Sequence, residues 1–403
     1  MHCLLIHQMF ALPSEGGGTR HFEFARYCVE QGEQFTAITS DVSYLHGNRT
    51  SKPREELIGG VRIYRVAMPA ALHKNFFWRM VAYLGFMQKS FVAGWKQGTH
   101  ADVIMGTSPS LFQAFAASMV ALFRRKPFLL EIRDLWPDFA IDMGVLKSRV
   151  AIFLSRRLEN HLYRRARHIV VNSPAYVEYL VNKGVAREKI SLISNGVDPD
   201  MFSPSLDSAT YRKRHHLEGK FIAVYAGAIG PANDIRTIVD AAKILSNDPE
   251  IHFVIAGDGK ARGEIEQLIE QLKLTNISMP GVIPKSEIAE FLAMADVCLA
   301  TLMDIRMFKM TFPNKVFDYM AAGRPTILGI DGVIREVLEK SEGGIFVQPG
   351  DPQSLAQAVK RLQQDPPLRH RMGQQAREYV VKHFNRKDQA EQFRCLLENL
   401  LDS

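Results

Sequence analysis

The chain has 403 residues, a formal net charge of +7 and a hydrophobic fraction of 46%, which together predict a folded protein of two domains. Its four scattered cysteines show neither metal-ligand spacing nor a framework of pairs, which disfavours a disulfide-rich secreted domain and indicates a reducing, cytoplasmic compartment. We expect neither a signal peptide nor a membrane-spanning helix. The positive charge favours an anionic ligand or membrane surface, and no basic run is dense enough to indicate nucleic acid.

The first half alternates short β-branched runs with helical patterns, which is typical of parallel strands joined by crossover helices. The first expected strand, residues 3–9, is followed by a glycine run and a helix over residues 19–31. Further strands are expected at residues 35–40, 61–68, 102–108, 128–134, 168–173 and 190–195.

The second half repeats this alternation after a linker rich in turn residues, 195–219. Its strands are expected at residues 221–226, 252–256, 277–280, 297–302, 325–330 and 344–348. The final helical pattern is interrupted near residues 383–386. We therefore predict an α/β protein with a first domain of residues 1–200 plus the final helix 384–403, and a second domain of residues 201–383.

The loop SEGGGTR, residues 14–20, follows the first expected strand and opens a helix. Gly16, Gly17 and Gly18 would let the backbone approach a phosphate or a sugar, and the N–H groups at a helix start favour an anion. A loop that merely needs tight turns is the alternative interpretation.

The segment EIRDLWP, residues 131–137, ends the fifth expected strand. Charged residues directly after a buried strand are costly unless they are paired or used. Arg133 is therefore a candidate for contact with a phosphate or an acceptor, and Asp134 for contact with a hydroxyl. A mutual ion pair, or a helix cap by Asp134, is the structural alternative.

Two glycine turns are expected at one end of the second set of strands. The loop GAIG carries Gly227 and Gly230 between a strand and a helix, where such a loop can hold a diphosphate. Asp258 in the turn AGDG also follows a strand, but an aspartate in that position most often closes a turn.

The segment FPNKVFDYMAAGRP, residues 312–325, predicts a short helix with Pro313 near its start and Gly323 past its end. Lys315 and Asp318 lie three residues apart and therefore on one face. Lys315 would add a full charge where the helix dipole already favours phosphate, and Asp318 could accept hydrogen bonds from ribose hydroxyls. An ion pair on a solvated helix is the alternative.

Taken together, these segments resemble the retaining GT-B glycosyltransferases of family four. The resemblance covers nearly the whole chain in family order, through ISNGVDPDMF at 193–202, AGDG at 256–259, GVIPKSEIAEFLAMADV at 281–297, PNKVFDYMAAGRP at 313–325 and REYVVKHFN at 377–385. It implies two Rossmann-like domains facing a cleft, with the last helix crossing back to the first domain. EIRDLWP and GAIG are most similar to a bacterial branch that adds N-acetylated or deoxy amino sugars, such as L-fucosamine, to surface polysaccharides including O-antigen.

The resemblance also implies the reaction and the residues that perform it. A sugar would pass from a nucleotide diphosphate donor, UDP-linked, to a lipid-diphosphate-linked saccharide. The implied donor-binding residues are Gly16, Gly17 and Gly18 near the phosphates and the reacting centre, Gly227 and Gly230 at the diphosphate, Gly281, Val282 and Ile283 at the base, Lys315 at the pyrophosphate and Asp318 at the ribose. Arg133 and Asp134 would take the place of a histidine that many members carry near the donor sugar, and are the catalytic candidates.

The chain departs from the family pattern at the donor site. Many members have two glutamates with seven residues between them, and here these positions are Met310 and Asp318. Many also place an arginine and a lysine after the strand that opens the second domain, and here these positions correspond to Ala228 and Asn233. The donor charge must then be met elsewhere, by Lys309, Arg306 or Lys315.

No cofactor and no metal ion is expected. The segment Asp198-Pro199-Asp200 looks like the Asp-x-Asp motif of metal-dependent glycosyltransferases. It lies in the linker signature, however, and therefore indicates a turn.

A long helical pattern over residues 73–96 interleaves aromatic and cationic side chains. Such a helix can lie in an anionic membrane interface, which would place the protein peripherally at the inner membrane near a lipid-linked acceptor. An amphipathic core helix is the alternative.

Two other functions remain open at this stage. Met310, Ala228 and Asn233 would also suit a non-catalytic, nucleotide-sugar-binding partner of another transferase. A nucleotide-sugar 2-epimerase can share the fold, although the acid/base cluster that it needs is not evident. A dehydrogenase is not indicated, because no acidic residue follows a full dinucleotide fingerprint at the required distance.

Overall fold

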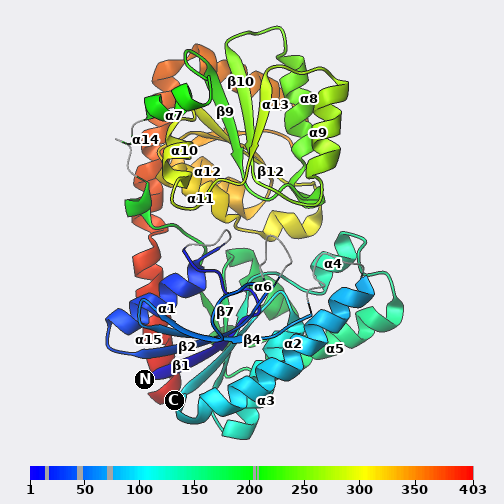
Figure 1. Cartoon of the computed structure of the whole chain (residues 1–403), viewed down its shortest axis with the longest axis vertical. Helices are drawn as coiled ribbons and strands as arrows, with labels where there is room; N and C mark the ends of the chain where they lie inside the picture. Colours follow the sequence, from blue (N-terminus) through cyan, green and yellow to red (C-terminus); the bar gives the residue numbers. More distant parts are fainter. Residues whose placement is uncertain (14–17, 43–48, 70–75, 203–205, 207, 403) are drawn as a thin grey trace. The chain divides into compact units, whose positions relative to one another are not determined.

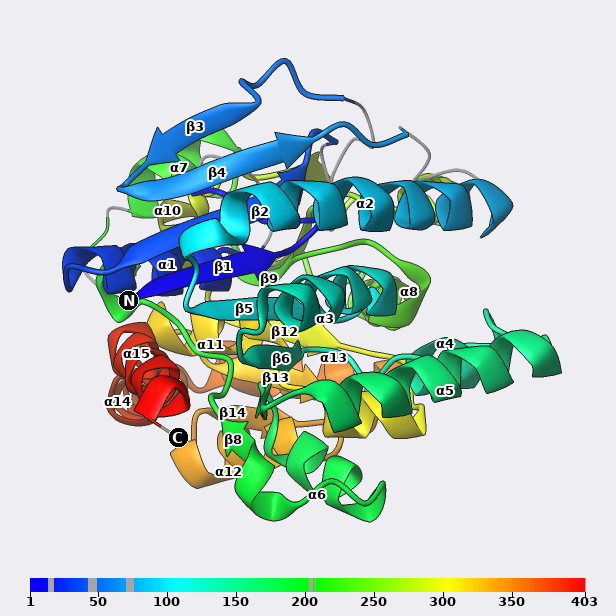
Figure 2. The same cartoon turned by 90° about the horizontal axis from the view of Figure 1, so that it is seen from below.

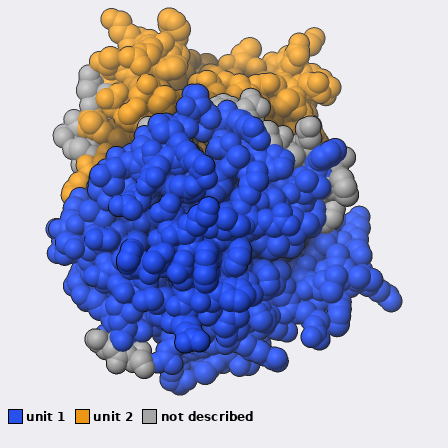
Figure 3. Space-filling view, turned by 60° about the horizontal axis from the view of Figure 1, so that its bottom comes forward, with its two compact units in different colours: residues 1–194, 387–403 blue, residues 195–386 orange. Residues whose placement is uncertain are grey.

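The computed structural model describes residues 1–13, 18–42, 49–69, 76–202, 206 and 208–402. It divides into two compact units, residues 1–194 with 387–403 and residues 195–386 (Figure 3). The boundary lies after Ser194 and not after residue 200, because the next residues already bond within the second unit. Asn195 Nδ2 donates to the Phe312 carbonyl at 2.7 Å, and the Val197 N–H donates to the Phe384 carbonyl at 3.0 Å.

The first unit is built on an eight-stranded sheet with the order β3-β4-β2-β1-β5-β6-β7-β8. All neighbouring strands are parallel except β3 and β4, which pair antiparallel at one edge. The strands are β1 (His2–Ile6), β2 (Gln34–Ser40), β3 (Glu55–Ile58), β4 (Val61–Val66), β5 (Val103–Thr107), β6 (Phe128–Ile132), β7 (His168–Val171) and β8 (Ile190–Leu192).

Helices cover both faces of this sheet (Figures 1 and 2). The helices of this unit are α1 (Arg20–Glu30), α2 (Phe76–Gln97), α3 (Leu111–Arg124), α4 (Asp138–Asp142), α5 (Arg149–Arg165), α6 (Pro174–Asn182) and α15 (Arg386–Asp402), with short 3-10 turns η1 (Gly98–His100) and η2 (Arg187–Lys189). On one face α2 packs on α3, and α3 packs on α5. Among the described residues, no helix is long and apolar enough to cross a bilayer.

The last helix, α15, packs against α1 on the opposite face (Figure 1). The ring of Phe393 stacks on that of Phe24 at 5.1 Å, and Leu397 is fully buried in the same cluster. Arg394 reaches Glu33 at 3.6 Å. The expected return of the final helix to the first domain is therefore present, and burial of its apolar stripe is what holds it there.

The second unit has a six-stranded parallel sheet with the order β11-β10-β9-β12-β13-β14. Its strands are β9 (Phe221–Ala226), β10 (Ile251–Ala256), β11 (Ile277–Gly281), β12 (Val297–Thr301), β13 (Thr326–Gly329) and β14 (Gly344–Phe346). Its helices are α7 (Ser208–Arg214), α8 (Ile235–Ile244), α9 (Arg262–Gln271), α10 (Ile288–Ala293), α11 (Asn314–Ala321), α12 (Val333–Ser341), α13 (Pro352–Gln364) and α14 (Pro366–His383), with turns η3 (Pro199–Met201), η4 (Pro231–Asn233) and η5 (Arg306–Met310).

Alternate residues of these strands enter two separate cores. Along β9, Ala223 and Tyr225 face the core made with α8, α9 and α13, whereas Ile222 and Val224 face the core made with α10, α11, α12 and α14. Strands buried on both faces are a property of parallel sheets covered by helices. The expected α/β class with two parallel, Rossmann-like domains is therefore confirmed.

Every strand expected from the sequence is present, and most end earlier than expected. The sequence does not predict β3, because two of its four residues, EELI, are charged and the strand lies half exposed at a sheet edge. The expected strand 128–134 runs past the observed end at Ile132, because the N–H groups of the next two residues, Arg133 and Asp134, donate to Ser108 Oγ. Those residues form the functional sites described next.

Candidate functional site

Each sheet has one point where the strand order reverses. In the first unit this is between β1 and β5, and in the second unit between β9 and β12. Ligands of open parallel sheets bind beyond the carboxyl ends of the strands at such points. Candidate ligand sites are therefore the loops after β1, β5 and β6 in the first unit and the loops after β9 and β12 in the second.

In the first unit, Glu131 of β6 is the centre of a buried polar network. Its carboxylate accepts hydrogen bonds from Arg20 Nε at 3.0 Å, from Thr107 Oγ1 at 3.0 Å and from His21 Nε2. Burial alone would raise the pKa of Glu131, but His21, Arg20 and Arg133 outweigh it and hold that pKa well below its usual range. Glu131 is therefore a fully ionised structural carboxylate.

Arg20 extends this network to the end of the sheet. Its Nη1 and Nη2 donate to the carbonyls of Ser194 and Ile193, each at 2.6 Å. The guanidinium of Arg20 is thus paired with a carboxylate and two carbonyls of the first unit. Two motifs that the sequence presents separately, SEGGGTR and EIRDLWP, are joined by this buried pair.

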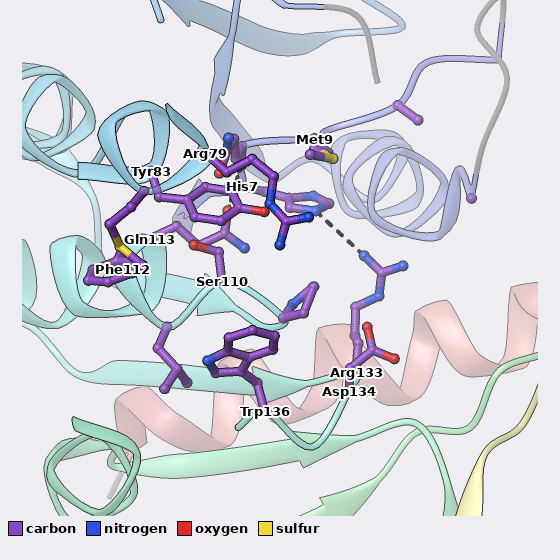
Figure 4. Close-up of a pocket in the computed structure, with 16 residues that line it drawn as sticks. His7, Met9, Arg79, Tyr83, Ser110, Phe112, Gln113, Arg133, Asp134 and Trp136 are labelled. Atoms are coloured by element: carbon purple, nitrogen blue, oxygen red, sulfur yellow. Dashed lines mark hydrogen bonds between the residues drawn. The ribbon is translucent and has the colours of Figure 1, made fainter. Parts of the chain in front are cut away.

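A pocket of about 330 Å³ opens beside the network (Figure 4). Residues of α2, of the loops after β1, β5 and β6, and of the start of α3 line it. They include His7, Gln8, Met9, Gly18, Arg79, Met80, Tyr83, Ser110, Leu111, Phe112, Gln113, Arg133, Asp134 and Trp136. Both catalytic candidates from the sequence therefore lie in one cavity.

Ser108 fixes the backbone of these two residues. Its Oγ accepts from the N–H groups of Arg133 and Asp134 at 2.7 and 3.1 Å and donates to the Asp134 carbonyl at 3.1 Å. Arg133 Nη1 donates to His7 Nε2 at 3.5 Å (Figure 4). Burial, reinforced by His21 and Arg133, holds the pKa of His7 well below its usual range, so this imidazole is neutral.

The side chains of Arg133 and Asp134 do not form an ion pair within 4 Å. Burial raises the pKa of Asp134, and Arg133 opposes that effect only in part. The expected alternative of a mutual salt bridge is thus absent between these two described residues. A carboxylate with a raised pKa in a cavity is suited to exchange a proton.

In the second unit, Lys315 lies on the first turn of α11, after β12. Its Nζ donates to Tyr225 Oη at 2.6 Å and to Asn233 Oδ1 at 3.3 Å, and lies 4.0 Å from the centre of the Tyr225 ring. Burial lowers the pKa of Lys315 to about 7. These partners are neutral, and no carboxylate of the described residues pairs with this ammonium.

Glycines bring three loops of this unit together around Lys315. A Cβ on Gly227 would lie 2.9 Å from Lys315 Nζ, and one on Gly257 would lie 1.8 Å from the Gly227 carbonyl oxygen. The Gly257 N–H donates to the Gly281 carbonyl at 2.7 Å. Glycine is required at Gly257 because no side chain fits between the two loops. The segments expected at the diphosphate and at the base are thus in contact.

The other residues expected at this site occupy varied environments. Asp318 is half-buried one turn beyond Lys315, and Gly230 begins the turn η4. Ile283 packs against the core, whereas Val282 is 43% exposed.

Lys309 lies in η5 and is engaged by two carboxylates. Its ammonium is 3.1 Å from Asp304 and 3.5 Å from Asp331. Its charge is thus balanced within the unit, in contrast to that of Lys315.

The remaining expected residues are glycines of the first loop and two aspartates of turns. Gly16 and Gly17 lie outside the described residues, whereas Gly18 lines the pocket of the first unit. Asp198 closes a turn by accepting from the Asp200 N–H at 3.1 Å. Asp258 does the same for the Gly259 N–H at 2.8 Å.

The sequence did not single out several residues of these sites. Tyr225 contacts Lys315, and His7 and Arg79 line the first pocket. Asn233, which the sequence marked only as a departure from the family pattern, also contacts Lys315. Position directly after a strand could have marked His7, which follows β1. Arg79 lies on a helix distant in sequence from the other lining residues, so only the tertiary fold brings it there.

Comparison with known proteins identifies the family. Residues 15–196 match the glycosyl transferase 4-like domain, and residues 207–379 match the glycosyl transferases group 1 domain. The chain belongs to the group 1 glycosyltransferases.

One relative and two solved structures span nearly the whole length of this glycosyltransferase. The "Putative colanic acid biosynthesis glycosyl transferase WcaI" of Escherichia coli (strain K12) is 22% identical over 391 residues, 92% of this chain and 93% of that protein. Sucrose-phosphate synthase from Thermosynechococcus elongatus superposes with a TM-score of 0.80 at 20% identity, covering 100% and 99% of the two chains. Anabaena Alr3699/HepE, solved in complex with UDP and glucose, gives 0.76 at 16% identity, covering 99% and 100%. The two structures share the GT-B fold with this chain.

Replacing Lys315 with methionine is expected to stabilise the ligand-free glycosyltransferase at neutral pH. The unfolded chain keeps this proton up to the ordinary pKa of 10.5, whereas the folded chain releases it near 7. Wild-type stability therefore rises with pH across this window. We expect Lys315→Met to gain roughly 1–4 kcal/mol at neutral pH, and the gain to shrink toward about pH 10.

Urea unfolding of both proteins between about pH 6.5 and pH 9.5 measures this difference. Lys309→Met is the matched control, because its paired ammonium should give no pH-dependent difference in the same range. A Lys315→Met protein that is less stable than wild type, or a difference that does not vary with pH, would contradict the account.

Proposed function

We propose that this glycosyltransferase transfers a sugar, with retention of configuration, from a nucleotide diphosphate donor to a lipid-linked saccharide in bacterial surface polysaccharide synthesis. The observation that carries the donor assignment is the ammonium of Lys315. It is buried against neutral groups at the switch point of the second sheet, beside a glycine loop and at the start of a helix. An ammonium without an anionic partner, at the start of a helix, is suited to bind a diphosphate.

Each donor group has a matching environment in this proposal. The diphosphate lies between Lys315 and the Gly227–Gly230 loop, where α8 and α11 begin. Asp318, one turn further on α11, accepts hydrogen bonds from the ribose. Backbone groups of Gly281, Val282 and Ile283 face the base, and Lys309 serves the phosphates only if it leaves its two carboxylates.

The donor is proposed to be a UDP-linked, N-acetylated or deoxy amino sugar. The complex of Anabaena Alr3699/HepE with UDP and glucose supports the choice of uridine. Met310, at the end of η5, supports a donor with an apolar or acetylated substituent, since a thioether cannot accept a hydrogen bond from a hydroxyl as a carboxylate does. The name of the relative from Escherichia coli supports a role in polysaccharide synthesis.

The chemical step needs stabilisation of the departing diphosphate. Negative charge develops there as the sugar becomes an oxocarbenium ion, so a preorganised cation such as Lys315 lowers the barrier. In a front-face mechanism, the departing phosphate oxygen helps to take the acceptor proton. Asp134, whose pKa is raised by burial, is the side-chain candidate for that role. No metal ion is required in this scheme.

Saturation-transfer NMR with UDP-N-acetylglucosamine, UDP-glucose and GDP-mannose tests the donor site. We expect one UDP-sugar to bind wild type, and Lys315→Ala and Asp318→Ala each to weaken that binding by roughly 10-fold or more, because each removes a hydrogen bond to a charged group. Lys309→Gln should change it little. If no nucleotide sugar binds, or if both alanine variants bind as wild type does, the proposed donor and its site are wrong.

We also propose that the first unit contacts the cytoplasmic face of the inner membrane through α2 and its neighbours. Nine of the eighteen large apolar side chains that are exposed in the described residues belong to α2, α3 and α5, among them Trp78, Trp95, Phe123 and Phe153. Helices α2 and α3 contain no acidic residue. The one acid of α5, Glu159, is buried and bonded to Lys183 at 2.7 Å.

Basic groups complete this surface. Lys89 and Lys96 are exposed on α2, and a groove along α5 is lined by Arg149, Arg156 and Arg157. Exposed aromatic rings among cations, without acids, suit an anionic lipid interface. The side chains at residues 73–77 lie outside the description.

Sedimentation with vesicles tests the membrane contact. We expect binding to vesicles that contain phosphatidylglycerol and a loss of roughly 10- to 30-fold for the Lys89→Gln and Lys96→Gln double variant, since each basic residue near an anionic surface contributes about 1 kcal/mol. The matched control, Lys243→Gln with Lys382→Gln, removes two exposed charges from the second unit. Equal losses for both pairs, or equal binding to phosphatidylcholine vesicles, would refute the assignment.

A further inference from the structure

Two arginines enter the pocket of the first unit and form no ion pair within 4 Å with a described carboxylate. Arg79 projects from α2, makes no hydrogen bond or ion pair with any described residue, and has a buried Nε without an acceptor. For the Arg133 side chain, the one hydrogen bond to a described residue is that with neutral His7. Figure 4 shows both guanidinium groups directed toward the same space beside His7. Because a guanidinium stays charged and is costly to bury alone, the pair calls for an anion.

Other polar atoms of the lining also lack partners. Ser110 Oγ and His7 Nδ1 are buried and make no hydrogen bond in the described structure. Ser110 precedes α3, yet its hydroxyl does not cap that helix. Since His7 Nε2 accepts from Arg133, the neutral ring carries its proton on Nδ1. Buried polar groups are almost always satisfied, so several orphans in one lining indicate groups that a ligand satisfies.

The opposite wall of the pocket is apolar and aromatic. Tyr83, Phe112 and Trp136 contribute rings, and Tyr83 and Phe112 stack with their centres 6.5 Å apart. Arg79 and Tyr83 are one turn apart on α2, so this helix supplies both the cation and part of the apolar wall. A ligand that fits both features carries an anionic group next to an apolar or ring-shaped one.

We propose that Arg79 and Arg133 bind the phosphate of the acceptor, while Tyr83, Phe112 and Trp136 hold the apolar or sugar group next to that phosphate. The inference rests on the proposed function and names the chemical class of its acceptor, a phosphate or diphosphate ester. The donor diphosphate is a second source of the same anion, and the experiment separates the two.

The test uses the full chain and geranyl diphosphate as the probe, followed by tryptophan fluorescence because Trp136 lies in the pocket. We expect saturable binding to wild type, weakened about 10- to 100-fold by Arg79→Gln and by Arg133→Gln, since each removes a charge-assisted hydrogen bond. Lys243→Gln removes one exposed charge from the second unit and should leave the affinity unchanged. Arg79→Lys should retain part of the binding.

A folding defect is separated from a binding defect by thermal unfolding without ligand. Arg79 makes no polar contact with a described residue, so Arg79→Gln should unfold at or above the wild-type temperature. A clearly lower unfolding temperature, together with lost binding in Arg79→Lys, would overturn the proposal in favour of a structural role.

Lys315→Met distinguishes this site from the donor site. It should weaken the binding of UDP and leave that of geranyl diphosphate intact, whereas Arg79→Gln should do the reverse. If Arg79→Gln weakens the binding of UDP instead, the arginines bind the donor. That result would contradict the acceptor proposal without contradicting the proposed glycosyl transfer. Absence of binding to wild type, or equal losses for Arg79→Gln and Lys243→Gln, would also overturn it.

Discussion

The buried carboxylate of Glu131 is the interaction on which the first unit depends. It holds α1 through Arg20 and His21 and holds β5 through Thr107, and Arg20 continues to the carbonyls after β8. A buried charge is tolerated only when paired and hydrogen-bonded in this way. The network fixes the carboxyl edge of the sheet, and with it the loop that carries Arg133 and Asp134. Loss of either side of the Arg20–Glu131 pair would leave a buried, uncompensated charge.

Against this background, the cations without an acidic partner are informative. Arg20, Lys183 and Lys309 are matched by carboxylates. In the second unit, Lys315 donates hydrogen bonds to the phenol of Tyr225 and the amide of Asn233. In the first unit, Arg133 donates to the neutral imidazole of His7. A cation held without an ion pair reduces stability, and its retention beyond the carboxyl ends of parallel strands is typical of a site that receives an anion. The donor and acceptor assignments both follow from this contrast.

The sequence predicted the fold well because apolar periodicity is local, and it predicted the donor site in part. Lys315 and Gly227 could be named because each follows a strand or begins a helix, whereas Gly281 was implied only by the resemblance to a family. Their contacts could not be named, since Tyr225 and Asn233 reach Lys315 through tertiary packing. The pairing of Arg20 with Glu131 joins residues 111 positions apart, and the engagement of Lys309 by Asp304 and Asp331 is likewise invisible in a linear pattern. Arg79 has no local signal, because α2 presents it to a pocket made by distant loops.

Hydrogen–deuterium exchange of the full chain with UDP-N-acetylglucosamine tests most directly the claim that unpaired charge marks the ligand sites. We expect slower exchange in the peptides that cover residues 225–233 and 313–322 of the second unit. The same peptides should be unaffected in Lys315→Met, while wild type shows no change around Glu131. Protection confined to the first unit, or protection that persists in Lys315→Met, would contradict the account.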